Sequence, residues 1–99
     1  KKSEINKLVG REIVTRLSAS SERDWAINVG RFTSRYAAEQ MLLKTALSEM
    51  STLNGSLRKV VEKGARFEAN FIGLSKEAAK RACRRLTARN VTCSALGPS

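Results

Sequence analysis

The chain has 99 residues, the length of one compact domain, which leaves no room for a second independent core. Its 19 Lys and Arg residues outnumber 9 Asp and Glu residues, and the formal charge of +10 either attracts polyanions or simply keeps the domain soluble. The chain has no His, which excludes Ser-His-Asp and Cys-His catalytic arrangements, so we expect no enzyme, cofactor or metal site. No apolar run reaches the length of a membrane span, so we expect no membrane insertion.

Residues 1–23 are polar and charged, with apolar residues at helical spacing, and predict a linker or an amphipathic helical extension. The apolar positions are Ile5, Leu8, Val9, Ile13 and Leu17. Such a helix can pack loosely on the domain of residues 24–97, form a homodimer with a neighbouring copy, or lie on a membrane surface. The chain starts without Met or an apolar signal core, which indicates a fragment of a longer protein.

One supersecondary unit occurs twice in the sequence. Residues 25–33 align with residues 67–75 at a shift of 42 residues. Each copy begins with alternating apolar residues, which predicts a strand with one buried face and places Asn28 and Asn70 on the opposite face. The alternating residues are Trp25, Ile27 and Val29 in the first copy and Phe67, Ala69 and Phe71 in the second.

A hydroxyl N-cap and a helix are expected after each strand. The first helix covers about residues 34–50 after Thr33 or Ser34, and the second begins after Ser75. Tyr36 lies either at the core edge or at the rim of a site. The expected core sides are Ala38, Met41, Leu42, Thr45 and Ala46, then Ala78, Ala79, Ala82, Cys83 and Leu86. The basic side of the second helix is interpreted as a solvated surface, formed by Lys76, Lys80, Arg81, Arg84, Arg85 and Arg89.

Further strands are expected at residues 57–62 and 91–96, with a hairpin turn at residues 63–65. The order β-α-β-β-α-β predicts an α+β fold, a four-stranded antiparallel sheet covered on one face by two helices (RNP/ferredoxin-like). The other sheet face remains open as a binding platform. There the amides of Asn28 and Asn70 suit sugar hydroxyls and N-acetyl groups, unless they are simply solvated strand residues.

The repeated pattern over residues 25–96 resembles the SPOR domain, the sporulation-related repeat. The first half-motif is similar to WAINVGRFT at residues 25–33, followed by Ala37 and Ala38. The second half-motif is matched more loosely by residues 67–75, followed by Ala78 and Ala79. The second half also resembles the C-terminal SPOR module of D-alanyl-D-alanine carboxypeptidases of some Gram-negative bacteria, in Gly73-Leu74-Ser75, Ala82-Cys83, Leu86 and Cys93.

The resemblance implies a non-catalytic, periplasmic module that binds peptidoglycan glycan strands, preferably stripped of stem peptides, and brings its parent protein to the cell wall or division septum. It implies a site on the open sheet face, where Asn28 corresponds to the family's Gln and Arg66 to an aromatic residue of some members. Arg31, Arg66 and Glu68 either rim this face, where an Arg can pair with the lactyl carboxylate of a denuded glycan, or are ordinary surface charges. The expected glycan-binding residues are therefore Asn28, Arg31, Arg66, Glu68 and Asn70.

The two cysteines are Cys83, on the buried side of the second helix, and Cys93, on the following strand. A helix packed on its adjacent strand can bring two such residues within bridging distance, although two buried thiols are the alternative. The oxidising compartment that the resemblance implies favours a disulfide between them.

An RRM-like RNA-binding domain is the alternative function, because the RRM has the same strand order and the charge suits RNA. RRMs stack bases on exposed aromatic residues of their two central strands. Here Trp25, Phe67 and Phe71 fall on the side expected to face the helices, and no RNP-type run occurs. We therefore expect no nucleic-acid partner.

Overall fold

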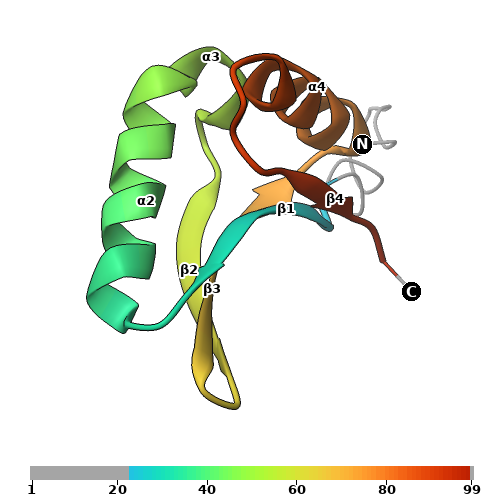
Figure 1. The fold of residues 1–99 in the computed structure, drawn as a ribbon. Coiled ribbons are helices and arrows are strands. Elements are labelled where there is room, and N and C mark those ends of the chain that lie inside the picture. Colours follow the sequence, from blue (N-terminus) through green and yellow to red (C-terminus); the bar gives the residue numbers. More distant parts are fainter. Residues whose placement is uncertain (1–22, 99) are drawn as a thin grey trace, which may run out of the picture.

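The computed structural model describes residues 23–98, so the extension expected at the N-terminus lies almost wholly outside the described residues. The elements are β1 (Trp25–Phe32), α2 (Arg35–Ser48), α3 (Met50–Leu53), β2 (Leu57–Lys63), β3 (Arg66–Leu74), α4 (Lys76–Ala88) and β4 (Ser94–Leu96) (Figure 1). The strands form one antiparallel sheet in the order β2-β3-β1-β4. The predicted βαββαβ fold is therefore confirmed, with α3 as a short addition after the first helix.

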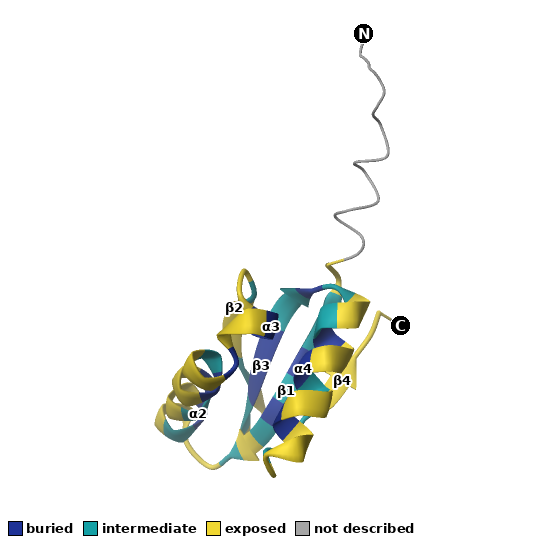
Figure 2. Cartoon of the chain, turned by 90° about the horizontal axis from the view of Figure 1, so that it is seen from above, coloured by how far each residue is buried: buried dark blue, intermediate teal, exposed yellow. Residues whose placement is uncertain are grey.

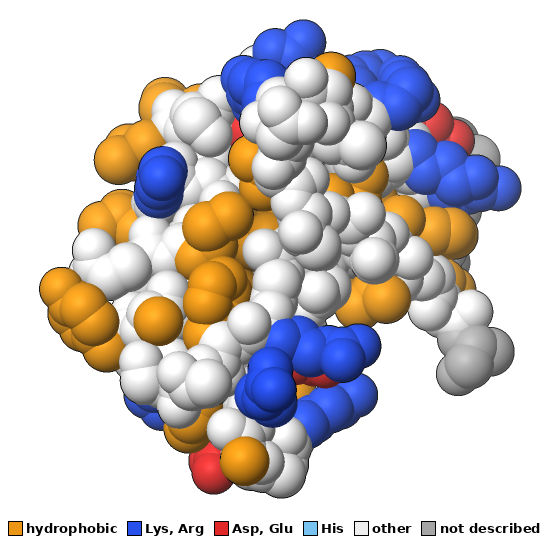
Figure 3. Space-filling view, in the orientation of Figure 1, with side chains coloured by type: hydrophobic (Ala, Val, Ile, Leu, Met, Phe, Trp, Pro, Cys, Tyr) orange, Lys and Arg blue, Asp and Glu red, His pale blue; other side chains and the backbone are white. Residues whose placement is uncertain are grey.

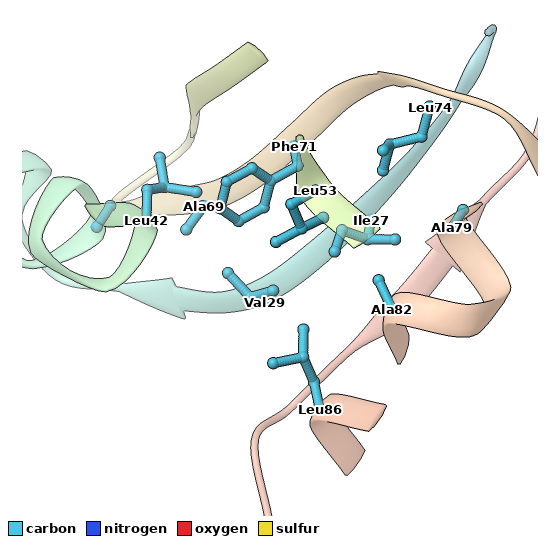
Figure 4. Packing of buried hydrophobic residues seen from close by; sticks show 11 residues of the cluster. Ile27, Val29, Leu42, Leu53, Ala69, Phe71, Leu74, Ala79, Ala82 and Leu86 are labelled. Atoms are coloured by element: carbon cyan, nitrogen blue, oxygen red, sulfur yellow. The ribbon is translucent and has the colours of Figure 1, made fainter. Parts of the chain in front are cut away.

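The helices lie on one face of the sheet, as Figure 2 shows from above. Helix α2 packs against β3 and β1, whereas α4 packs against β1 and β4. Between the two layers lies the hydrophobic core, which strand and helix side chains enter from opposite sides (Figure 4). Its fully buried members include Ile27 and Val29 from β1, Ala69 and Phe71 from β3, and Leu86 from α4. The alternation read from the sequence thus predicted the buried face correctly.

Both long helices start at a serine. The hydroxyl oxygen of Ser34 accepts a hydrogen bond from the backbone N–H of Ala37 at 3.1 Å, and that of Ser75 accepts one from Ala78 at 3.1 Å. Each serine satisfies an N–H group that has no partner inside the helix. Of the two caps considered for the first helix, Ser34 is the one used.

Strand β4 is shorter than the predicted strand of residues 91–96, because the end of α4 uses part of that segment. Asn90 adopts a positive φ of 65°. Its N–H donates to the carbonyl of Thr87 at 3.0 Å, and the N–H of Val91 donates to Leu86 at 2.9 Å. This hydrogen-bond pattern is a Schellman C-cap, in which an αL residue closes the helix. The chain therefore joins the sheet only from Ser94.

A disulfide joins Cys83 of α4 to Cys93, just before β4, and the two Cα atoms are 5.1 Å apart. This confirms the expected pairing. The bridge fastens α4 to the segment that leads into the edge strand, where the buried residues of the helix are mostly alanines.

Candidate binding site on the open sheet face

A polar row crosses the sheet on the face that none of the described helices covers. The ladder pairs Asn70 with Asn28 on one side and with Lys59 on the other, and it pairs Asn28 with Ser94. Residues directly opposite each other in an antiparallel ladder point to the same face. Lys59, Asn70, Asn28 and Ser94 therefore form a continuous row across all four strands, which we call the polar row.

The two amides of the polar row bind each other. The Nδ2 group of Asn28 donates to Oδ1 of Asn70 at 2.7 Å, and Oδ1 of Asn28 accepts from the backbone N–H of Gly30 at 3.1 Å. Asn28 is thus engaged at both ends of its amide. Asn70 is only 7% exposed, and within residues 23–98 its own Nδ2 group donates no hydrogen bond. A buried donor without a partner carries a desolvation cost, so this amide is the one that can gain most from a ligand oxygen.

A β-bulge in β1 places Arg31 beside the polar row. Asn28 pairs with Asn70 and Arg31 pairs with Glu68, so the two intervening residues of β1 face a single residue of β3. Gly30 supplies the positive φ of 137° that the bulge requires. The extra residue returns Arg31 to the same face as Asn28. Without it, strict alternation would turn Arg31 toward the helices.

Glu68 lies between two cations on the open face. Its carboxylate is 3.4 Å from Nε of Arg31 and 4.0 Å from Nζ of Lys63, and its side chain is largely buried. Arg66 pairs with Lys63 at the end of the hairpin and is exposed. The structure therefore brings all five expected site residues onto one face. The carboxylate of Glu68 is already paired with Arg31 and Lys63, so it is not a free acceptor.

Strand β2 also contributes to this face, which was not predicted from the sequence. Lys59 and Lys63 alternate with the half-buried Val60 and the exposed Glu62, and the ladder places both lysines on the side of Asn70. The signal in the sequence was weak, because the apolar residues of this strand are divided between its two faces, with Val60 on one and Val61 on the other. Among residues 23–98, the ladder places four cationic side chains around one carboxylate on the open face, namely Arg31, Lys59, Lys63 and Arg66 around Glu68.

On the opposite side of the molecule, one buried carboxylate corrects the interpretation of the basic face of α4. Glu49, between α2 and α3, is 1% exposed and accepts hydrogen bonds from Nε of Arg85 at 2.6 Å, from Arg89, and from the hydroxyl of Thr52 at 2.8 Å. Arg85 and Arg89 are therefore structural and not merely solvated. The signal was weak, because Glu49 and Arg85 are 36 positions apart in the sequence.

Two opposing effects set the pKa of Glu49. Burial on its own raises this pKa, but the hydrogen bonds from Thr52, Arg85 and Arg89 and the charge of Arg85 outweigh burial and hold the pKa below its ordinary value. The carboxylate is therefore charged at neutral pH. It fastens the junction of α2 and α3 to α4.

Further properties limit what kind of site the described residues can form. No group of three potential metal-ligating side chains occurs within residues 23–98. In the same range, no helix has the length and apolar character needed to cross a membrane. The disulfide is typical of proteins in oxidising, extracytoplasmic compartments.

No protein-family model matches this chain, and no curated protein is significantly similar to it. The fold and the open sheet face therefore carry the functional inference.

Proposed function

We propose that the chain is a SPOR-type domain, a non-catalytic module that binds the glycan strands of peptidoglycan through its open sheet face. It holds its parent protein at the cell wall or division septum, in the periplasm of a Gram-negative bacterium. The observation that carries this proposal is the Asn28–Asn70 pair at the centre of the face, with a nearly buried amide donor that no described residue uses.

Amide and cationic groups recognise different parts of a glycan. The Nδ2 group of Asn70 is suited to a sugar hydroxyl or an acetamido oxygen. Arg31 and Lys59 attract carboxylates to either side of it. A glycan stripped of stem peptides has free lactyl carboxylates, whereas the same groups are amides when the peptides are attached. The cationic rim therefore favours the denuded strand.

The Cys83–Cys93 disulfide supports a location in the periplasm, because disulfides persist there and are rare in the cytosol. The resemblance of the second half-motif supports a D-alanyl-D-alanine carboxypeptidase as the parent protein. In that arrangement the catalytic domain acts on the wall while this module fixes its position.

Co-sedimentation with purified cell-wall sacculi, before and after amidase removal of the stem peptides, tests the proposal. We expect stronger pelleting with the stripped material. Asn70→Asp should reduce pelleting about tenfold, because it keeps the oxygen that Asn28 binds but replaces the free donor with a negative charge. Asn54→Asp makes the same change at an exposed position after α3 and should pellet like the wild type.

A second pair of variants tests the cationic rim. Lys59→Gln should lower pelleting, whereas Lys76→Gln on α4 should not, although both remove one charge from an exposed lysine. Equal losses in the two variants would show that only the net charge matters. Equal binding to RNA and sacculi, abolished by moderate salt, would indicate a nonspecific cation and refute the glycan site.

A further inference from the structure

Strand β2 leaves one edge of the sheet open. In the described part of the chain it pairs only with β3, over the full length from Leu57 to Lys63. The opposite edge of the sheet, β4, has only 3 residues. A long edge strand presents unpaired N–H and C=O groups that can accept another strand. The edge at β2 is therefore the place where this sheet can be extended.

Helix α2 carries a second apolar surface in addition to the one that faces the core. Tyr36, Leu43 and Leu47 recur at helical spacing on α2, and Met50 follows at the start of α3; their exposed fractions are 71%, 44%, 66% and 63%, respectively. We call this set the outer stripe. Figure 3 shows hydrophobic side chains gathered over α2. Of the two positions considered from the sequence, the core edge and the rim of a site, the exposure of Tyr36 excludes the core edge.

The outer stripe and the free edge lie next to each other. A groove of about 590 Å³ runs between α2 and β2 and has a mixed polar and apolar lining. Its helix side is formed by Arg35, Glu39, Gln40, Leu42 and Leu43, and its strand side by Arg58, Lys59 and Val60. Leu43 belongs to both the groove and the outer stripe. A partner that adds a strand to β2 and places its own helix on the same face would therefore cover the groove and the outer stripe together.

The charges of β2 suit one particular partner strand, a second copy of β2 in antiparallel orientation. When the pairing is centred on Val60, Arg58 of each copy lies opposite Glu62 of the other, and no like charges oppose each other. If the pairing is centred on Lys59, the Lys59 side chains of the two copies face each other. If it is centred on Val61, Lys59 of each copy faces Lys63 of the other. Centres at Arg58 or Glu62 oppose identical charges. A register centred between two residues is excluded as well, because a shift by one residue reverses the faces and would place the helices of the two copies on opposite sides of the joined sheet.

We propose that two copies of this chain associate through β2, with Val60 on the two-fold axis, so that the two sheets become continuous and the two outer stripes meet. The two open faces then lie on the same side of the joined sheet. This inference does not depend on the proposed glycan binding, because it uses the opposite face and the edge of the domain.

Charge exchange tests the proposed register. Sedimentation equilibrium of the full 99-residue chain should show a monomer–dimer equilibrium. Arg58→Glu and Glu62→Arg should each raise the dimer dissociation constant at least about tenfold, because each creates two like-charge pairs across the axis. The double variant Arg58→Glu/Glu62→Arg should restore dimerisation. Arg81→Glu, an equal charge change on α4, should leave it unchanged.

Cross-linking tests the position of the axis independently. Val60→Cys should form a covalent dimer under mild oxidation. The Cα atoms of residues directly opposite each other in an antiparallel pair are about 4.5–5.5 Å apart, which is within the range of disulfides. Lys59→Cys should not, because in this register Lys59 faces Val61 of the other copy. Circular dichroism checks that both variants fold. A wild-type monomer at all concentrations, or a dimer that the charge exchange does not restore, would overturn the proposal.

Discussion

Replacing Glu49 by Gln is expected to destabilise the domain by about 2–3 kcal/mol. The carboxylate accepts hydrogen bonds from two arginines and from Thr52 while being almost fully buried. A hydrogen bond to a charged group contributes about 1.5–3 kcal/mol, and Gln keeps the shape but loses the charge. The side chains of Arg85 and Arg89 are 54% and 44% exposed, so water partly compensates them, and the loss stays below that of a fully buried ion pair.

Urea unfolding followed by the fluorescence of Trp25, the single Trp of the chain, measures this loss. Glu39→Gln is the matched control, because Glu39 lies exposed on α2 and its replacement should change the unfolding free energy by no more than about 0.5 kcal/mol. A loss at Glu49 as small as that of the control would refute the structural role given to this carboxylate.

The same cluster predicts a pH dependence. Because the pKa of Glu49 is lower in the folded domain than its ordinary value of 4.5, its contribution to stability is complete above that value. The contribution is lost as the pH falls through the lower pKa of the folded state. The difference in unfolding free energy between the wild type and Glu49→Gln, measured from about pH 7 to about pH 3, should therefore narrow as the pH falls below 4.5. A constant difference over this range would contradict the lowered pKa.

Two further perturbations concern the disulfide and the bulge. Reducing the Cys83–Cys93 bond should lower the unfolding free energy by about 2–3 kcal/mol, measured by urea titration with and without reductant, and an unchanged midpoint would exclude this contribution. Gly30→Ala should cost about 2 kcal/mol or more, because φ is 137° and the new Cβ would lie 3.0 Å from the ring of Phe32. Gly64→Ala, where the Cβ meets no atom within 4 Å, should cost only about 1 kcal/mol, and equal losses would show that the bulge tolerates a side chain.

Most of the fold was predictable because its signals are local. Alternation at residues 25–29 and 67–71 identifies the buried side of β1 and β3 without any knowledge of their neighbours. Ser75 and the Gly64 turn similarly mark a helix start and a hairpin through chemistry within a few residues. The strand predicted at residues 91–96 was too long, because the C-cap at Asn90 was not read as one.

The site was less predictable, because its geometry depends on contacts between distant segments. Both asparagines were predicted on the correct face. Their hydrogen bonds were not predictable, because the amide of Asn28 donates to Asn70 on another strand and accepts from the N–H of Gly30 at the bulge. The bulge that places Arg31 on the open face could not be predicted, because it is defined by the pairing of β1 with β3. The contact between Glu49 and Arg85 joins residues 36 positions apart and could not be predicted from either segment alone.

The way α4 is attached has a consequence for how the domain opens. Its buried residues are Ala79, Ala82 and Leu86, so this helix contributes little apolar area to the core. The covalent link at Cys93 and the arginine contacts to Glu49 compensate for that deficit. Both attachments weaken under reducing or acidic conditions. Subglobal unfolding in such conditions should therefore begin at the C-terminal helix, whose amide protons would exchange with solvent before those of β1 and β3.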